Sequence, residues 1–122
     1  MNWLIIALIF ILLFYLWIRR GGKPYNFGRG IAKAQLTGIK RFSEDNLSKE
    51  DLYVKSILSR PGVERYFDEA EIRHNLKRNT NFAQLVELLA ISEFQWRIGR
   101  LPNEDESNKI HEGIYSVIPD DL

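Results

Sequence analysis

The chain has 122 residues and a formal net charge of +1, with 45% hydrophobic and 27% charged residues and no cysteine. The absence of cysteine excludes a thiol nucleophile and leaves the redox compartment open. The near-neutral total conceals an asymmetry, because residues 19–42 hold seven basic and no acidic residues, or +7, whereas the rest of the chain carries −6. This acidic remainder disfavours nucleic-acid binding.

Residues 3–18 are the most apolar stretch, and they contain no charged, amide or hydroxyl-bearing residue except Tyr15. Sixteen helical residues rise about 24 Å, against about 30 Å for the hydrocarbon core of a bilayer. Flanking polar residues and arginine stems can cover the difference. The sequence therefore predicts an uncleaved signal-anchor, a transmembrane helix over residues 1–20. The side chains expected at the membrane interfaces are Trp3, Tyr15, Trp17, Arg19 and Arg20.

Two other interpretations of this stretch fit less well. A cleaved signal peptide needs a basic start and small residues at a cleavage site, and neither is present. A buried core helix this apolar needs a larger protein around it than the hundred or so residues that follow. Because lysine and arginine are retained on the cytoplasmic side, the basic residues after the stretch predict an external N-terminus and a cytoplasmic C-terminal part.

Residues 21–42 are expected to form a basic juxtamembrane segment in two parts. Four glycines and a proline within residues 19–30 predict a flexible linker. A phosphate-binding loop is disfavoured there, because the G-x-x-x-x-G-K-[ST] pattern and its preceding strand are missing. Residues 31–42 have the periodicity of a basic amphipathic helix, whose apolar face docks either on the following domain or on the membrane. The candidate contacts with anionic lipid are Lys23, Arg29, Lys33, Lys40 and Arg41.

Residues 43–122 are predicted to form a small helical domain with an acidic C-terminal tail. Helices are expected at about 49–59, 69–78 and 82–98, and from residue 103 onward. Each begins with a capping residue and a polar or acidic residue three positions later, namely Ser48 and Asp51, Asp68 and Glu71, Asn81 and Gln84, and Asn103 and Glu106.

Residues 82–98 are the most apolar segment after the anchor, and they are predicted to form the central helix of the domain. Gln84, Glu87 and Glu93 interrupt the segment, so a second membrane span is disfavoured. Ile110, Ile114 and Val117 follow helical spacing in the last segment. The β-rich run over residues 113–118 keeps a strand as the alternative there.

Chemistry-bearing motifs are incomplete. Glu71 and His74 form one Glu-x-x-His unit, but a di-iron site needs two such units and further glutamates. His111 and Glu112 begin a zinc-protease motif whose second histidine position is Tyr115. The acidic run over residues 103–109 lacks the glycine and final glutamate of a calcium loop. No catalytic, cofactor or metal residue is therefore predicted.

These observations predict an all-α protein, with a single N-terminal transmembrane helix followed by a soluble domain of four or five helices. The expected function is a non-catalytic, membrane-tethered interaction or adaptor module that faces the cytoplasm and binds an unidentified protein partner. The alternative is a peripheral lipid-binding or membrane-organising protein that acts through its basic juxtamembrane segment.

Overall fold

Six α-helices and two short 3₁₀ turns make up the computed structural model of the chain, and no strand occurs among the residues that it describes. Those residues are 2–20, 22–78, 81–119 and 122, and the side chains of residues 16–20 are not described. The predicted all-helical class is therefore confirmed. The helices are α1 (Asn2–Arg20), α2 (Gly22–Phe42), α3 (Lys49–Leu58), α4 (Glu69–Lys77), α5 (Phe82–Ile98) and α6 (Glu104–Tyr115), and the 3₁₀ turns are Ser43–Asp45 and Val63–Arg65.

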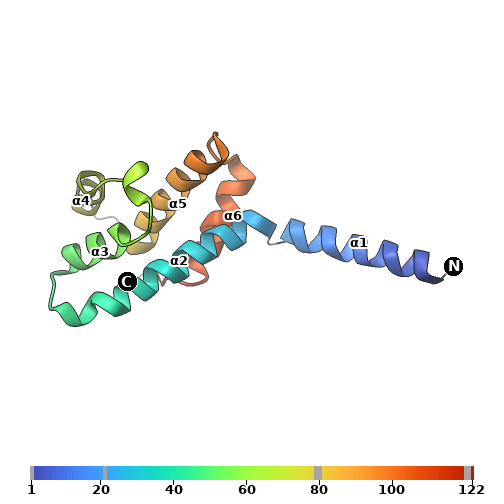
Figure 1. Cartoon of the computed structure of the whole chain (residues 1–122), viewed down its shortest axis with the longest axis horizontal. Helices are drawn as coiled ribbons and strands as arrows, with labels where there is room; N and C mark the ends of the chain where they lie inside the picture. Colours follow the sequence, from blue (N-terminus) through green and yellow to red (C-terminus); the bar gives the residue numbers. More distant parts are fainter. Residues whose placement is uncertain (1, 21, 79–80, 120–121) are drawn as a thin grey trace.

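Helix α1 projects from one end of a body formed by α2 to α6 (Figure 1). The transmembrane helix predicted over residues 1–20 is not supported, because no helix in the described part of the chain combines the length and the apolar character needed to cross a membrane. Its uninterrupted apolar run covers sixteen residues, which rise about 24 Å, less than the about 30 Å of a bilayer's hydrocarbon core. The helix is nevertheless apolar on every side, and its described side chains are largely exposed.

Helix α2 begins at Gly22, so most of the segment predicted as a flexible linker is helical. One glycine of α2, Gly28, and one of α6, Gly113, are contact points between these two helices. A Cβ atom added to Gly28 would collide with the backbone carbonyl of Ile110 in α6, and one added to Gly113 would collide with the carbonyl of Tyr25 in α2. Two backbones can approach this closely only where side chains are absent, so glycine permits the α2–α6 packing instead of breaking the helix.

The predicted starts of α3 to α6 are confirmed by hydrogen bonds at their caps. The side chains of Ser48, Asp68 and Asn81 each accept a hydrogen bond from the backbone N–H three residues later. Asn103 and Glu106 form a reciprocal capping box at the start of α6. These bonds satisfy amide groups that have no partner inside the helix, which explains why the boundaries follow the local sequence closely.

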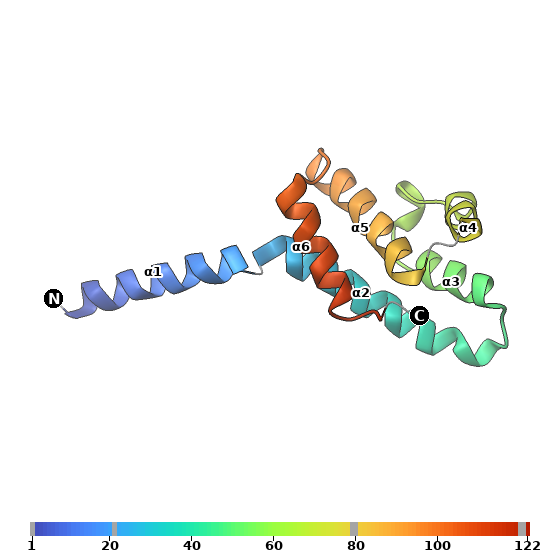
Figure 2. The same ribbon diagram turned by 180° about the vertical axis from the view of Figure 1, so that it is seen from behind.

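Helix α5 lies centrally in the body, as predicted, and contributes the largest set of buried side chains (Figure 2). Not every apolar side chain of α5 is buried, since Trp96 and Ile98 near its C-terminus are exposed. Helix α5 ends at Gly99, whose φ of 86° lies in the left-handed region that glycine favours. The strand alternative for residues 113–118 is wrong, because α6 continues through Tyr115.

Candidate functional site

The first candidate site is the surface of α1. Twelve of its apolar side chains are at least about half exposed, and Trp3 and Tyr15 near the two ends of this surface are 69% and 58% exposed. The other predicted interface residues, Trp17, Arg19 and Arg20, have side chains outside the described part of the structure. An exposed apolar surface of this size is unusual for a water-soluble monomer, and such surfaces mark contacts with lipid or with another protein.

The second candidate site is a basic face on α2. At 100° per residue its five cations fall within about 120° of the helix circumference. All five are exposed, and no carboxylate among the described residues pairs with any of them. The structure thus places together on one helix the residues predicted as lipid contacts, Lys23, Arg29, Lys33, Lys40 and Arg41.

The opposite face of α2 is buried in the body. Ile31, Ala32 and Ile39 belong to the hydrophobic core, and the Ser56 hydroxyl donates a hydrogen bond of 2.8 Å to the backbone carbonyl of Gln35. Of the two alternatives for the amphipathic helix, the structure shows docking of its apolar face on the domain. The basic face remains available to an anionic partner because it lies on the other side of the helix.

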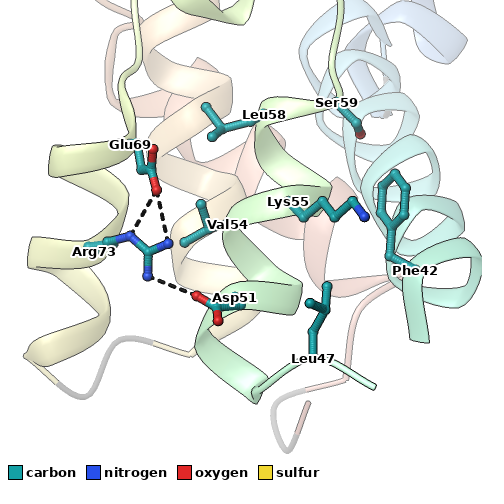
Figure 3. A pocket seen from close by; sticks show the side chains of 9 residues that line it. All are labelled: Phe42, Leu47, Asp51, Val54, Lys55, Leu58, Ser59, Glu69 and Arg73. Carbon is teal, nitrogen blue, oxygen red and sulfur yellow. Dashed lines mark hydrogen bonds and ion pairs between the residues drawn. The ribbon is translucent and has the colours of Figure 1, made fainter. Parts of the chain in front are cut away.

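The third candidate site is a groove at the far end of the body from α1, lined by the C-terminal residue of α2, by α3 with residues just before and after it, and by α4 (Figure 3). Its volume is about 590 Å³. Leu47 and Leu58, two large aliphatic side chains, are each 37% exposed at the groove. The lining residues are Phe42, Leu47, Asp51, Val54, Lys55, Leu58, Ser59, Glu69 and Arg73.

Charged side chains hold the two sides of the groove in place. The Arg73 guanidinium on α4 donates hydrogen bonds to Glu69 and, across the groove, to Asp51 on α3 at 3.0 Å. The pKa of Asp51 lies below its ordinary value. The hydrogen bond from Arg73 has the largest effect on it, and the hydrogen bond with Ser48 has the next largest. On the other side, the Lys55 ammonium lies 4.7 Å from the centre of the Phe42 ring and pairs with Asp45. Arg73 also pairs with Glu50, so four carboxylates face two cations, and the groove combines an apolar surface with a paired rim that carries a net negative charge.

The sequence did not reveal the groove, because its residues come from segments up to 31 positions apart and share no motif. Two leucines could have indicated the groove, Leu47 just before α3 and Leu58 at its end. They add apolar side chains beyond those that a helix of this length needs in order to pack on one face. Phe42 and Arg73 carried no such signal. Their contribution depends on how α2 and α4 pack beside α3.

The histidine motifs noted in the sequence do not assemble a chemical site. His111 Nδ1 lies 3.0 Å from a carboxylate oxygen of Glu87, and its ring stacks on Tyr115 with ring centres 4.3 Å apart. Among the described residues, no group of three or more histidine, aspartate or glutamate side chains could hold a metal ion. The buried Glu93 accepts two hydrogen bonds from Arg60, at 2.8 and 3.0 Å, and this pair connects the turn after α3 to α5.

Comparisons of the chain with protein-family models, with curated proteins and with solved structures found no match. A function for this chain must therefore be argued from its own surfaces. Three of them stand out among the described residues, in order along the molecule: the apolar helix α1, the basic face of α2 and the groove beside α3.

Proposed function

We propose that the protein is a non-catalytic, membrane-tethered helical interaction module. The observation that carries the proposal is the exposed apolar surface of α1, whose side chains have no place in the core of the body. Burying a large aliphatic or aromatic side chain away from water is worth about 1.5 to 3 kcal/mol. Twelve such side chains supply far more than an anchor needs, so α1 favours lipid strongly over water.

The proposal requires that the side chains of α1 lie in lipid, and it rests on their exposure and not on the length of the helix. The charge pattern of the chain supports an external N-terminus and a cytoplasmic body, because its basic residues follow the apolar stretch. A tether of this kind raises the local concentration of the body at the membrane.

The groove lined by α2, α3 and α4 is the surface that we assign to a protein partner. It lies at the opposite end of the body from α1, so a tethered body presents it toward the aqueous phase (Figure 1). Its apolar lining fits one face of an amphipathic segment, and its paired charges can form a polar rim around that segment.

Binding of α2 to an anionic bilayer is the alternative, and its five unpaired cations favour it. Geometry restricts this alternative. The axial rise from Lys23 to Arg41 is about 27 Å, whereas salt screens charges beyond about 8 to 10 Å. Because α2 leads away from the end of α1 (Figure 1), a bilayer around α1 lies within reach of Lys23 but not of Lys40 and Arg41. We therefore rank the tethered interaction module first.

Membrane fractionation of the full chain tests the tether. The protein should remain in the membrane pellet after alkaline carbonate extraction, and a reporter fused after Leu122 should be active in the cytoplasm. Arginine at the centre of a membrane helix costs about 2.5 to 3.5 kcal/mol, so the double substitution Leu8→Arg and Leu12→Arg should move the protein to the soluble fraction. The control Leu88→Arg changes an exposed leucine of α5 and should leave it in the pellet. A wild-type chain that is fully extracted would overturn the proposal.

A further inference from the structure

A small hollow lies between the N-terminal end of α2 and the C-terminal end of α5. Its volume is about 230 Å³, and its lining residues are Lys23, Pro24, Phe27, Phe94, Arg97 and Ile98. Lys23 is the third residue after α1 ends. Both views of the fold show the C-terminal end of α5 on the side of the body from which α1 projects (Figures 1 and 2). If α1 lies in lipid, this hollow is near the membrane surface.

The floor of the hollow is apolar. Phe27 and Phe94 meet edge to face, with ring centres 6.1 Å apart. Ile98 is 57% exposed beside them, which leaves an aliphatic side chain facing water at the end of α5. Such a surface accommodates hydrocarbon better than it accommodates a hydrated ion.

Two cations border the hollow from opposite helices. Lys23 is exposed and pairs with no carboxylate among the described residues. The Arg97 guanidinium lies 3.0 Å from the Glu93 carboxylate, but it shares this carboxylate with Arg60, which donates two hydrogen bonds to it. Arg97 is half exposed and retains donors for a further anion, since a guanidinium has five N–H groups.

We propose that this hollow binds the anionic phospholipid of the surrounding bilayer, with a phosphate oxygen between Lys23 and Arg97 and acyl carbons against the rings and Ile98. The inference rests on the proposed tether, which places the hollow at the lipid surface. Charge complementarity selects an anionic head group, and the apolar floor, which the proposed tether places beside the bilayer, selects a lipid over a free phosphate. The bound lipid would fix the orientation of the body relative to the membrane.

The absence of cysteine allows a single probe to be attached to the full chain. Ile98→Cys, labelled with a small fluorophore, reports on the hollow, and Phe10→Cys reports on α1. Each labelled protein is reconstituted in vesicles that mix neutral and anionic phospholipid, with bromine atoms on the acyl chains of only one of the two. Bromine quenches the probe on contact. A separate sample with neutral vesicles and free inorganic phosphate tests the soluble anion.

We expect the residue 98 probe to be quenched at lower mole fractions of brominated anionic lipid than of brominated neutral lipid. Each cation near the surface contributes about a fivefold preference, so removing both with Lys23→Gln and Arg97→Gln should reduce that preference by about 25-fold. Lys40→Gln with Arg41→Gln removes the same charge at the far end of α2 and should have little effect. Lys23→Gln alone breaks no ion pair, so it keeps the test valid if the double variant unfolds.

The outcomes separate this inference from the proposed function. Quenching at residue 10 without quenching at residue 98 would overturn the lipid site and leave the tether standing. Equal quenching at residue 98 by neutral and anionic lipid would also overturn it, since the contact would then be with the bilayer in general. An emission change with phosphate alone would replace the lipid by a soluble anion. Absence of quenching at both residues would overturn the tether itself.

Discussion

Two neighbouring leucines of α5 have opposite surroundings at the residue scale. Leu89 is completely buried, whereas Leu88 is 38% exposed. Leu89→Ala should leave a cavity in the core and lower the free energy of unfolding by about 2 to 5 kcal/mol. Leu88→Ala makes the same chemical change and should cost less than about 1 kcal/mol. Thermal melts followed by circular dichroism measure both. Equal melting temperatures would show that α5 does not form the core.

Glu106 connects the stability of α6 to pH. Its carboxylate accepts a hydrogen bond of 2.7 Å from Arg100 and one of 3.0 Å from the backbone N–H of Asn103. Arg100 first, and the Asn103 amide second, hold the pKa of Glu106 below its ordinary value of 4.5. A folded-state pKa below that of the unfolded chain stabilises the protein above the unfolded value, and this contribution is lost as the pH falls through the folded value.

Glu106→Gln should therefore melt at a lower temperature than the wild type at pH 7, and the difference should shrink as the pH falls below 4.5. Glu104→Gln alters an exposed carboxylate on the same turn and serves as the control. Melting temperatures measured from pH 7 down to pH 3 test the prediction. A difference between Glu106→Gln and the wild type that stays constant over this range would contradict it.

Glycines of α2 have two distinct roles at the scale of secondary structure. A Cβ atom at Gly28 would collide with the backbone of α6, whereas one at Gly30 would meet nothing within 4 Å. Gly28→Ala should force the helices apart and cost about 1 to 3 kcal/mol. Gly30→Ala should stabilise the helix by about 0.4 to 1 kcal/mol, because alanine restricts the unfolded chain more than glycine does. Urea denaturation compares the two, and a stabilising Gly28→Ala would refute the close crossing of α2 and α6.

The two ends of the body differ at the scale of the whole molecule, with an apolar helix at one end and a groove at the other. A photoreactive amino acid at Leu58, beside the groove, should crosslink a discrete partner in native membranes. The same probe at Leu88 is a close control, since the two leucines are 37% and 38% exposed. Crosslinking from residue 88 but not from residue 58 would place the partner surface elsewhere on the body.

The starts of α3 to α6 could be predicted from the sequence because each depends on a hydrogen bond between residues three positions apart. Asn81 and Asn103 provide such bonds whatever the rest of the chain does. The apolar character of α1 and the basic segment that follows were likewise evident, since both are properties of composition. The central position of α5 followed from its density of apolar residues.

Contacts between distant segments were decided by the tertiary structure. Gly28 belongs to a helix and not to a linker because Gly113, 85 residues later, lets the two backbones meet. Leu58 and Ile98 are exposed because no helix among the described residues extends over them, which a helical period cannot indicate. The groove and the hollow each need side chains from two or more helices. Local hydrogen bonds and composition depend on residues that are close together in the sequence. The groove and the hollow form only when packing brings separate helices together.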